Sequence, residues 1–425
     1  MDHLLKVPNN PFELHIDTSP LDDSESSLNH WEEIRFLGRH PSRRSYHSAA
    51  SWNEKILIYG GQDLREGPQS GLWSLNLREA YFDAEPWEEI EIPGLGPLCR
   101  HSAIVKDDKM YVFGGSNGDR EFNTTSVIDL NSRSLTVIPP ERPDLPPSLD
   151  SHTACLYEDV ASSMVVFGGF AEGVRSNTVY ILNLSTQKWK RAQTDEEPSP
   201  RSNHSSVVYN HCLYIFGGSD DEGEKLCDLW KLDLRTYHWE KIIGHGQIPT
   251  GRSGHSAIVF KDDMVIFGGM RDITKETNDM FSFDFLTNTW TMFQFEFQIK
   301  DPVTPEQLEE YKKRKSINHN HKHKTVPEPT SPAKTPSLHI SKSPDASPVG
   351  EGLSFLKKKN SLYDGPPSPL EGRIRGKPPH PRDGHSAVVV NNFMYVFGGD
   401  RHQMPFNDLY AYRLVETTIK TPVQT

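Results

Sequence analysis

Six histidines recur at regular intervals along the chain, and imidazole rings gathered around one axis could hold a transition metal. Each precedes a Gly-Gly pair at a constant spacing, except in the third case, where the spacing is slightly longer. They lack the close local spacing of usual metal clusters. We therefore expect hydrogen bonds that hold strands to adjacent loops, with no bound metal and no cofactor. The six are His47, His101, His152, His204, His255 and His385.

Ten arginines could carry a second chemistry, the recognition of carboxylates. A guanidinium group binds a carboxylate through two parallel hydrogen bonds and also stacks on aromatic rings. The repeats described below bring the arginines to loops on one face, so we expect this face to bind other proteins, through an acidic peptide segment or a free C-terminal carboxylate. The candidates are Arg44, Arg65, Arg100, Arg120, Arg175, Arg201, Arg252, Arg271, Arg382 and Arg401.

An alternative interpretation of the same arginines is structural. Those that precede the histidines would bridge neighbouring repeats. Those in the other loops have acidic neighbours, such as Asp63 and Glu121, which would neutralise them.

The motifs of several enzyme classes are missing from the sequence. It contains no nucleophile elbow, no phosphate-binding loop and no HExxH motif. The four cysteines have no CxxC spacing, so they indicate neither a disulfide framework nor a zinc site. We expect a protein that is not an enzyme.

Composition excludes further classes. The chain has 425 residues and a formal net charge of −12, which argues against a general nucleic-acid binder. The longest apolar runs are about five residues, too short for a transmembrane helix, so we expect no membrane insertion. The first residues lack the apolar core of a secretory signal, and we expect a cytoplasmic protein.

A Gly-Gly pair recurs six times, and the first glycines of the pairs are Gly60, Gly114, Gly168, Gly217, Gly268 and Gly398. The spacing is nearly even up to the fifth pair and is much longer before the sixth. The sequence therefore predicts six repeats of about 50 residues, with an insertion between the fifth and the sixth. Each pair follows a short run of β-branched and aromatic residues, and most repeats then carry an aromatic residue and a tryptophan. We expect four antiparallel strands in each repeat, here called a, b, c and d, and hence a β-propeller blade.

The fifth repeat shows the pattern most completely, in residues 252–256 (RSGHS), 265–269 (VIFGG), 278–281 (NDMF) and Trp290. This pattern resembles a kelch repeat. The resemblance covers roughly 300 of the 425 residues. It implies an all-β, six-bladed kelch propeller. The sequence does not fix the oligomeric state, and a monomeric ring is the default expectation.

The sixth repeat ends near Leu414 without strand d. Trp31 precedes His47 by the same offset that separates Trp239 from His255. We therefore expect the segment around Trp31 to supply the missing strand and to close the ring, which removes an open sheet edge.

The resemblance implies a protein-interaction scaffold, because kelch propellers commonly act as scaffolds. They also serve as substrate receptors of ubiquitin ligases, and here that alternative would need a separate adaptor. A less favoured alternative is a metal-dependent enzyme like the copper-dependent galactose oxidase group.

The predicted organisation has five parts. An N-terminal tail (1–28) precedes the closing strand and blades 1–5 (29–299). A proline-rich, basic insertion (300–380) follows, then blade 6 (381–415) and a C-terminal tail (416–425). We expect the insertion to be mostly disordered, apart from a helix over 305–315. Its basic run at 312–315 resembles a nuclear-localisation cluster, which leaves the nucleus as an alternative compartment. Six residues of the insertion are candidate phosphorylation sites, namely Ser316, Ser331, Thr335, Ser343, Ser347 and Ser368.

Overall fold

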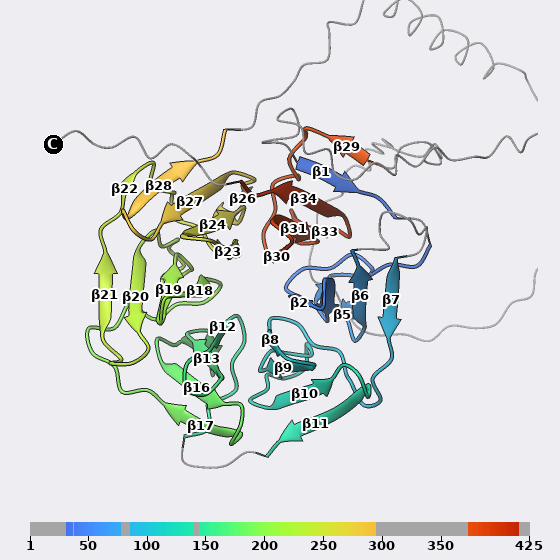
Figure 1. Ribbon diagram of the computed structural model, residues 1–425, viewed down its shortest axis with the longest axis horizontal. Helices are drawn as coiled ribbons and strands as arrows, with labels where there is room; N and C mark the ends of the chain where they lie inside the picture. Colours follow the sequence, from blue (N-terminus) through green and yellow to red (C-terminus); the bar gives the residue numbers. More distant parts are fainter. Residues whose placement is uncertain (1–30, 37, 78–85, 140–143, 295–372, 416–425) are drawn as a thin grey trace, which may run out of the picture. The chain divides into compact units, whose positions relative to one another are not determined.

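A computed structural model describes residues 31–36, 38–77, 86–139, 144–294 and 373–415. These residues form six antiparallel sheets around a central axis, a six-bladed β-propeller (Figure 1). The innermost strand of every blade is strand a and the outermost of its four is strand d. Within the described part of the chain there are only strands and loops, and no helix of membrane-spanning length and apolarity occurs there.

The first three blades each contain four consecutive strands in the order a, b, c, d. Blade 1 is built from β2 (Ser48–Trp52), β3 (Lys55–Tyr59), β6 (Leu72–Asn76) and β7 (Trp87–Ile90). Blade 2 is built from β8 (Ser102–Lys106), β9 (Lys109–Phe113), β10 (Thr125–Asp129) and β11 (Ser134–Ile138). Blade 3 is built from β12 (Thr153–Tyr157), β13 (Ser163–Phe167), β16 (Val179–Asn183) and β17 (Lys188–Arg191).

The last three blades repeat this plan, and the sixth takes strand d from the N-terminal segment. Blade 4 is built from β18 (Ser205–Tyr209), β19 (Cys212–Phe216), β20 (Leu229–Asp233) and β21 (Trp239–Ile242). Blade 5 is built from β23 (Ser256–Phe260), β24 (Asp263–Phe267), β27 (Met280–Asp284) and β28 (Thr289–Met292), and β22 (His245–Gly246) pairs with β28. Blade 6 is built from β30 (Ser386–Val390), β31 (Phe393–Phe397), β34 (Leu409–Arg413) and β1 (Trp31–Ile34).

Strand b of each blade is buried on both of its faces, as its continuous apolar sequence predicts. In blade 1, Ile56, Leu57 and Ile58 are all 0% exposed. The Gly-Gly pair that follows has positive φ angles and packs closely against neighbouring backbone. At Gly61 φ is +94°, and a Cβ there would approach the Cβ of His47 to 2.8 Å, so glycine is required.

The tryptophans of strand d hold neighbouring blades together. Each packs against the aromatic residue at the end of strand b in the preceding blade, with ring centroids 4.8–5.7 Å apart. The pairs are Trp31 with Phe267, Trp87 with Phe397, Trp189 with Phe113, Trp239 with Phe167, and Trp290 with Phe216.

The predicted ring closure is confirmed. Strand β1 pairs antiparallel with β34, and Trp31 lies opposite Tyr412. Trp31 is 0% exposed and makes the same contact to the preceding blade as the other tryptophans. The ring is therefore sealed by strands from the two ends of the described sequence (Figure 1).

One strand near the end of the expected insertion was not predicted. Residues Arg373–Arg375 form β29, which pairs with the outer edge of β1. The predicted helix over 305–315 and the six candidate phosphorylation sites lie outside the described residues, as do the two tails.

Candidate partner-binding face

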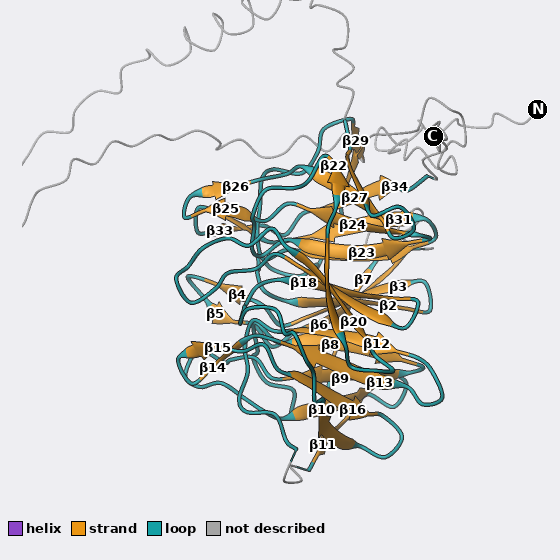
Figure 2. Ribbon diagram, turned by 90° about the vertical axis from the view of Figure 1, so that its left-hand side faces the viewer, coloured by secondary structure: helices purple, strands orange, loops and turns teal. Residues whose placement is uncertain are grey.

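The loops between strands b and c, and the connections from strand d to the next strand a, lie on one side of the propeller, here called the loop face. Four of the b–c loops fold into two-stranded hairpins that project from this side (Figure 2). The hairpins are β4 (Gln62–Asp63) with β5 (Gly67–Pro68), β14 (Phe170–Ala171) with β15 (Val174–Arg175), β25 (Met270–Asp272) with β26 (Lys275–Glu276), and β32 (Asp400–Arg401) with β33 (Met404–Pro405).

The tips of these hairpins expose large apolar side chains. One residue per hairpin is at least 60% exposed to solvent. Such side chains are normal when scattered singly, but here they recur on one face. They are Leu64, Val174, Ile273 and Met404.

A closed belt of six backbone hydrogen bonds fixes the loop face around the axis. The residue just before each repeated histidine donates its N–H to the carbonyl of its counterpart in the preceding blade, at 2.7–2.9 Å. All six belt residues have φ between 53° and 66°. The belt residues are Tyr46, Arg100, Ser151, Asn203, Gly254 and Gly384.

The repeated histidines form a second closed ring, and their predicted hydrogen-bonding role is confirmed. Their partner differs from the prediction: each Nε2 lies 2.7–2.9 Å from the hydroxyl that begins strand a of the preceding blade, not from a loop. Burial lowers the pKa of His101, His152 and His385 to about 3. The other three have their pKa lowered by the same cause. The rings are therefore neutral near pH 7, and no group of three or more potential metal ligands occurs among the described residues.

Four of the ten candidate arginines are not on the surface at all. Arg44 is 2% exposed, and Arg201, Arg252 and Arg382 are 0% exposed. Each guanidinium donates to the carbonyl of the first glycine of its own blade, at 2.7–3.1 Å. These four side chains are therefore not part of the exposed loop face, and they do not bridge blades either.

In blades 4, 5 and 6 this buried arginine is paired with an aspartate that precedes strand c. The shortest N–O distances are 2.6–2.7 Å. The pairs are Arg201 with Asp228, Arg252 with Asp279, and Arg382 with Asp408.

Arg100 belongs to a different position from these four, because it stands directly before its histidine and they stand two positions earlier. The structure places it in the belt, exposed, with its guanidinium 5.4 Å from the ring centre of Tyr46. The sequence interpretation grouped the two positions together. The offset from the histidine, three positions for the buried arginines and one for Arg100, was the signal that could have separated them.

The remaining arginines lie on the loop face with differing partners. Arg175 pairs with Asp221, and Arg271 pairs with Asp279. Arg65 and Arg120 are exposed and Arg401 is half-buried. Within the described part of the chain, these last three and Arg100 make no ion pair.

Charge in the b–c loops of the loop face is dominated by carboxylates, which corrects the expectation of an arginine-rich rim there. The six b–c loops contain seven Lys or Arg and fifteen Asp or Glu. Three of the fifteen are the aspartates held by buried arginines. The excess is concentrated in blades 4–6, where the loop of blade 4 alone has five carboxylates against Lys225.

One belt residue, Tyr46, contacts both the next belt residue and an aspartate. The Tyr46 hydroxyl donates to Asp383 Oδ2 at 2.6 Å, and its ring lies over Gly384, where a Cβ would come within 3.1 Å of three ring atoms. Burial raises the pKa of Asp383 to about 6, and the charges of Asp400 and Glu276 add to the effect. Neither Tyr46 nor Asp383 was a predicted site residue.

Comparison with known proteins agrees with the fold. Residues 24–158 and 100–308 match the family described as the KLHDC2/KLHL20/DRC7 Kelch-repeats domain, and residues 381–418 match the Kelch motif. Together these matches span more than half of the sequence. They are consistent with a protein-interaction domain.

Individual relatives are similar over the propeller. The chain is 29% identical to the leucine-zipper-like transcriptional regulator 1 homolog of Drosophila melanogaster, over 60% of this chain and 27% of that protein. It is 30% identical to acyl-CoA-binding domain-containing protein 4 of Arabidopsis thaliana, over 57% of this chain and 37% of that protein. It is 29% identical to human Kelch domain-containing protein 3, over 54% of this chain and 62% of that protein. The alignments thus span well under two thirds of the first two relatives. Six kelch-type blades and matches over both parts of the ring show that the chain belongs to the kelch-repeat family of β-propeller proteins.

Proposed function

We propose that the chain is a non-catalytic protein-interaction scaffold whose loop face binds an acidic segment of a partner. The binding residues would be Arg65, Arg100 and Arg120, here called the cationic sector. These three side chains are exposed and make no ion pair among the described residues. Exposed guanidinium groups on a rigid ring that make no ion pair are available to a carboxylate without first breaking one.

The three arginines come from adjoining blades. Arg65 lies in the b–c loop of blade 1, Arg120 lies in that of blade 2, and the two loops touch where Gly118 faces Pro68. The acid-rich loops of blades 4–6 would repel an acidic segment. The uneven charge of the loop face would therefore direct such a segment toward the cationic sector. The apolar hairpin tips supply further contact area.

A fluorescein-labelled hexaglutamate peptide tests this proposal by fluorescence anisotropy. Binding should weaken as salt is raised, and it should weaken about ten-fold or more in the double variant R100E/R120E. The control is R133E/R235E, which makes the same change of net charge in the c–d turns on the opposite side. An equal loss in both double variants would mean that net charge, and not the cationic sector, governs binding.

The same assay with hexalysine tests the opposite assignment. If hexalysine binds and hexaglutamate does not, the acidic loops of blades 4–6 form the binding surface and the proposal for an acidic segment fails. The ubiquitin-ligase alternative would use the same face and would add an adaptor that co-purifies with both the wild type and R100E/R120E.

A further inference from the structure

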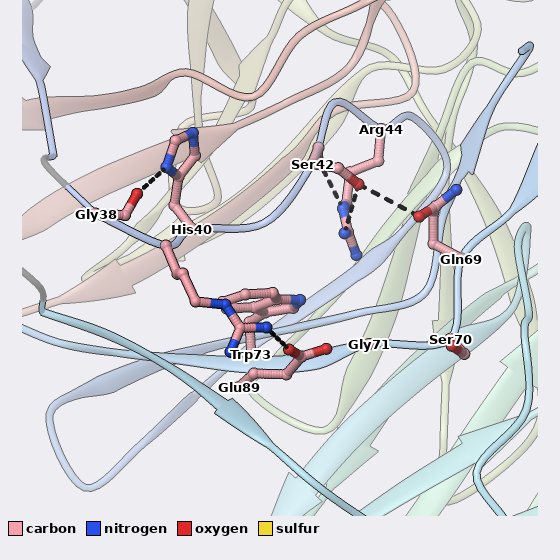
Figure 3. Close-up of a pocket in the computed structure, with 10 residues that line it drawn as sticks. Gly38, His40, Ser42, Arg44, Gln69, Ser70, Gly71, Trp73 and Glu89 are labelled. Carbon is pink, nitrogen blue, oxygen red and sulfur yellow. Dashed lines mark hydrogen bonds and ion pairs between the residues drawn. The ribbon is translucent and has the colours of Figure 1, made fainter. Parts of the chain in front are cut away.

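A pocket of about 380 Å³ lies beside blade 1, between the connection that enters strand a and the end of the b–c loop. Its lining includes Arg39, Arg44, Gln69, Gly71, Trp73 and Glu89 (Figure 3). None of these residues except Arg44 was a candidate site residue, and none belongs to the cationic sector.

Comparison of the six blades shows that blade 1 has an unusual combination of residues at this pocket. Blades 4, 5 and 6 have the buried arginine and its aspartate partner, whereas blades 2 and 3 have neither. The arginine positions of those two blades hold Leu98 and Leu149, and the aspartate positions hold Thr124 and Thr178. Blade 1 is the one blade that has the arginine without the aspartate: Arg44 is present, but Gly71 stands at the aspartate position.

Arg44 is consequently a buried cation with only neutral acceptors. Its Nη1 donates to the Gly60 carbonyl at 2.8 Å, its Nε to the Ser42 carbonyl at 3.0 Å, and its Nη2 to Ser42 Oγ at 3.1 Å. It makes no ion pair with any residue that the structure describes. Burial lowers its pKa to about 10, and the more distant charges of Glu89 and Glu66 oppose this shift. A buried charge without a counter-ion is costly, so a carboxylate would be favoured beside it.

The carboxylate that lines this pocket, Glu89, is already paired with another arginine. Glu89 Oε2 lies 2.6 Å from Arg39 Nη2, and the Arg39 guanidinium lies 5.8 Å from the ring centre of Trp73. Figure 3 shows Trp73 and Glu89 on one side of the pocket and the Arg44 side chain reaching toward them from the other. The space between them is where a counter-ion for Arg44 would lie.

The indole of Trp73 faces the same space. In blade 4 the equivalent Trp230 donates its Nε1–H to Asp228 Oδ2 at 2.7 Å. Trp73 has no such partner among the described residues, and a Cβ on Gly71 would come within 2.6 Å of its Nε1. Blade 1 therefore retains both donors that bind the aspartate in blade 4 but lacks the aspartate itself.

We propose that this pocket binds the carboxylate of an acidic ligand, which takes the place of the missing aspartate between Arg44 and Trp73 Nε1. The carboxylate accepts hydrogen bonds from both donors, as Asp228 does from Arg201 and Trp230. Such a carboxylate can come from a free small acid or from an aspartate side chain of a peptide, and the test distinguishes the two.

The test uses the full-length protein labelled with ¹⁵N at its tryptophan indoles. Three probes are titrated: succinate, N-acetyl-aspartate methylamide, and the neutral N-acetyl-asparagine methylamide. The signal of Trp73, assigned by its loss in W73F, is expected to shift saturably with the two acids and not with the asparagine compound. Tighter binding of succinate identifies a free acid as the preferred ligand, and tighter binding of the capped aspartate identifies a peptide.

Two variants test the two hydrogen-bond donors, Arg44 and Trp73, by calorimetry. Each introduces a residue that stands at the same repeat position in another blade. Arg44→Leu copies blades 2 and 3, and it should weaken binding of the better acid at least about ten-fold. Trp73→Phe copies Phe281 of blade 5, and it should weaken binding several-fold. The matched control is Trp230→Phe, which makes the same change where Asp228 occupies the site and should leave binding unaltered. The proposal is overturned if neither acid shifts Trp73, or if Arg44→Leu binds as the wild type does.

Discussion

At the scale of single residues, the same amino acid serves different purposes according to its place in the repeat. An arginine at the third position before the repeated histidine is buried and holds the first glycine of its blade. An arginine directly before the histidine, Arg100, lies in the belt and is exposed. Counting arginines in a loop therefore says little about charge on the surface unless each is assigned to its repeat position.

The repeated histidines make the stability of the ring depend on pH. Their pKa is lowered by burial, to about 3 in His101, His152 and His385. The ordinary pKa of a histidine is near 6.5. When the pH falls below this value, the histidines of the unfolded chain bind protons that those of the folded chain do not. Stability is therefore present above about pH 6.5 and is lost as the pH falls toward 3. At pH 5.5 each histidine should lower the free energy of unfolding by about 1.4 kcal/mol relative to its value well above pH 6.5.

Urea unfolding at pH 7.5 and 5.5 measures this effect. Three groups with a raised pKa act in the opposite direction as the pH falls, against the six histidines. They are Asp383, whose pKa is raised to about 6, Asp400 and His238. In His152→Gln, the free energy of unfolding should fall less between pH 7.5 and 5.5 than in the wild type, by the contribution of one histidine. An unfolding midpoint that stays constant between the two pH values would contradict the burial of neutral imidazoles.

At the scale of elements, strand β1 has the role of a core strand although it lies far from blade 6 in the sequence. Its tryptophan is packed between Phe267 and Tyr412, with ring centroids 5.0 and 5.1 Å away. The sequence predicted this pairing because the Trp-to-His offset repeats. It did not predict β29, because so short an edge strand has too little sequence to show a pattern.

Trp31→Ala should destabilise the whole propeller by about 3–5 kcal/mol, since it removes a fully buried indole from between two blades. Trp239→Ala is the matched variant, because Trp239 is also 0% exposed and occupies the same position in blade 4. Guanidinium unfolding should give losses that agree within about 1 kcal/mol. A loss below about 1 kcal/mol for Trp31→Ala alone would mean that β1 is an accessory strand.

At the scale of the whole molecule, periodicity predicted the fold well and the binding surface poorly. The number of blades, the strand order and the closing segment all follow from residues that recur because every blade needs them. The loop face is made of residues that differ between blades, such as the belt positions Tyr46 and Gly254. Their arrangement depends on which loops meet around the axis, and a one-dimensional pattern does not record this.

The missing aspartate in blade 1 is a case where the repeat pattern could have shown more. Gly71 departs from the rule that blades with the buried arginine also carry an aspartate. The rule became visible only after the structure showed that the arginine and the aspartate touch. Departures from a repeat are informative when the contact behind the repeat is known.

The propeller has two closed rings of hydrogen bonds, and its tryptophans pack between neighbouring blades. We therefore expect it to unfold as one cooperative unit that includes β1. Amide hydrogen exchange of the full-length native protein, followed by NMR or mass spectrometry, measures this directly at residues 31–34. The amides that pair with β34 should be protected to the same degree as those of β21 (Trp239–Ile242), which is the corresponding strand of blade 4. Exchange of residues 31–34 within seconds, with β21 still protected, would contradict a ring closed by its N-terminal strand.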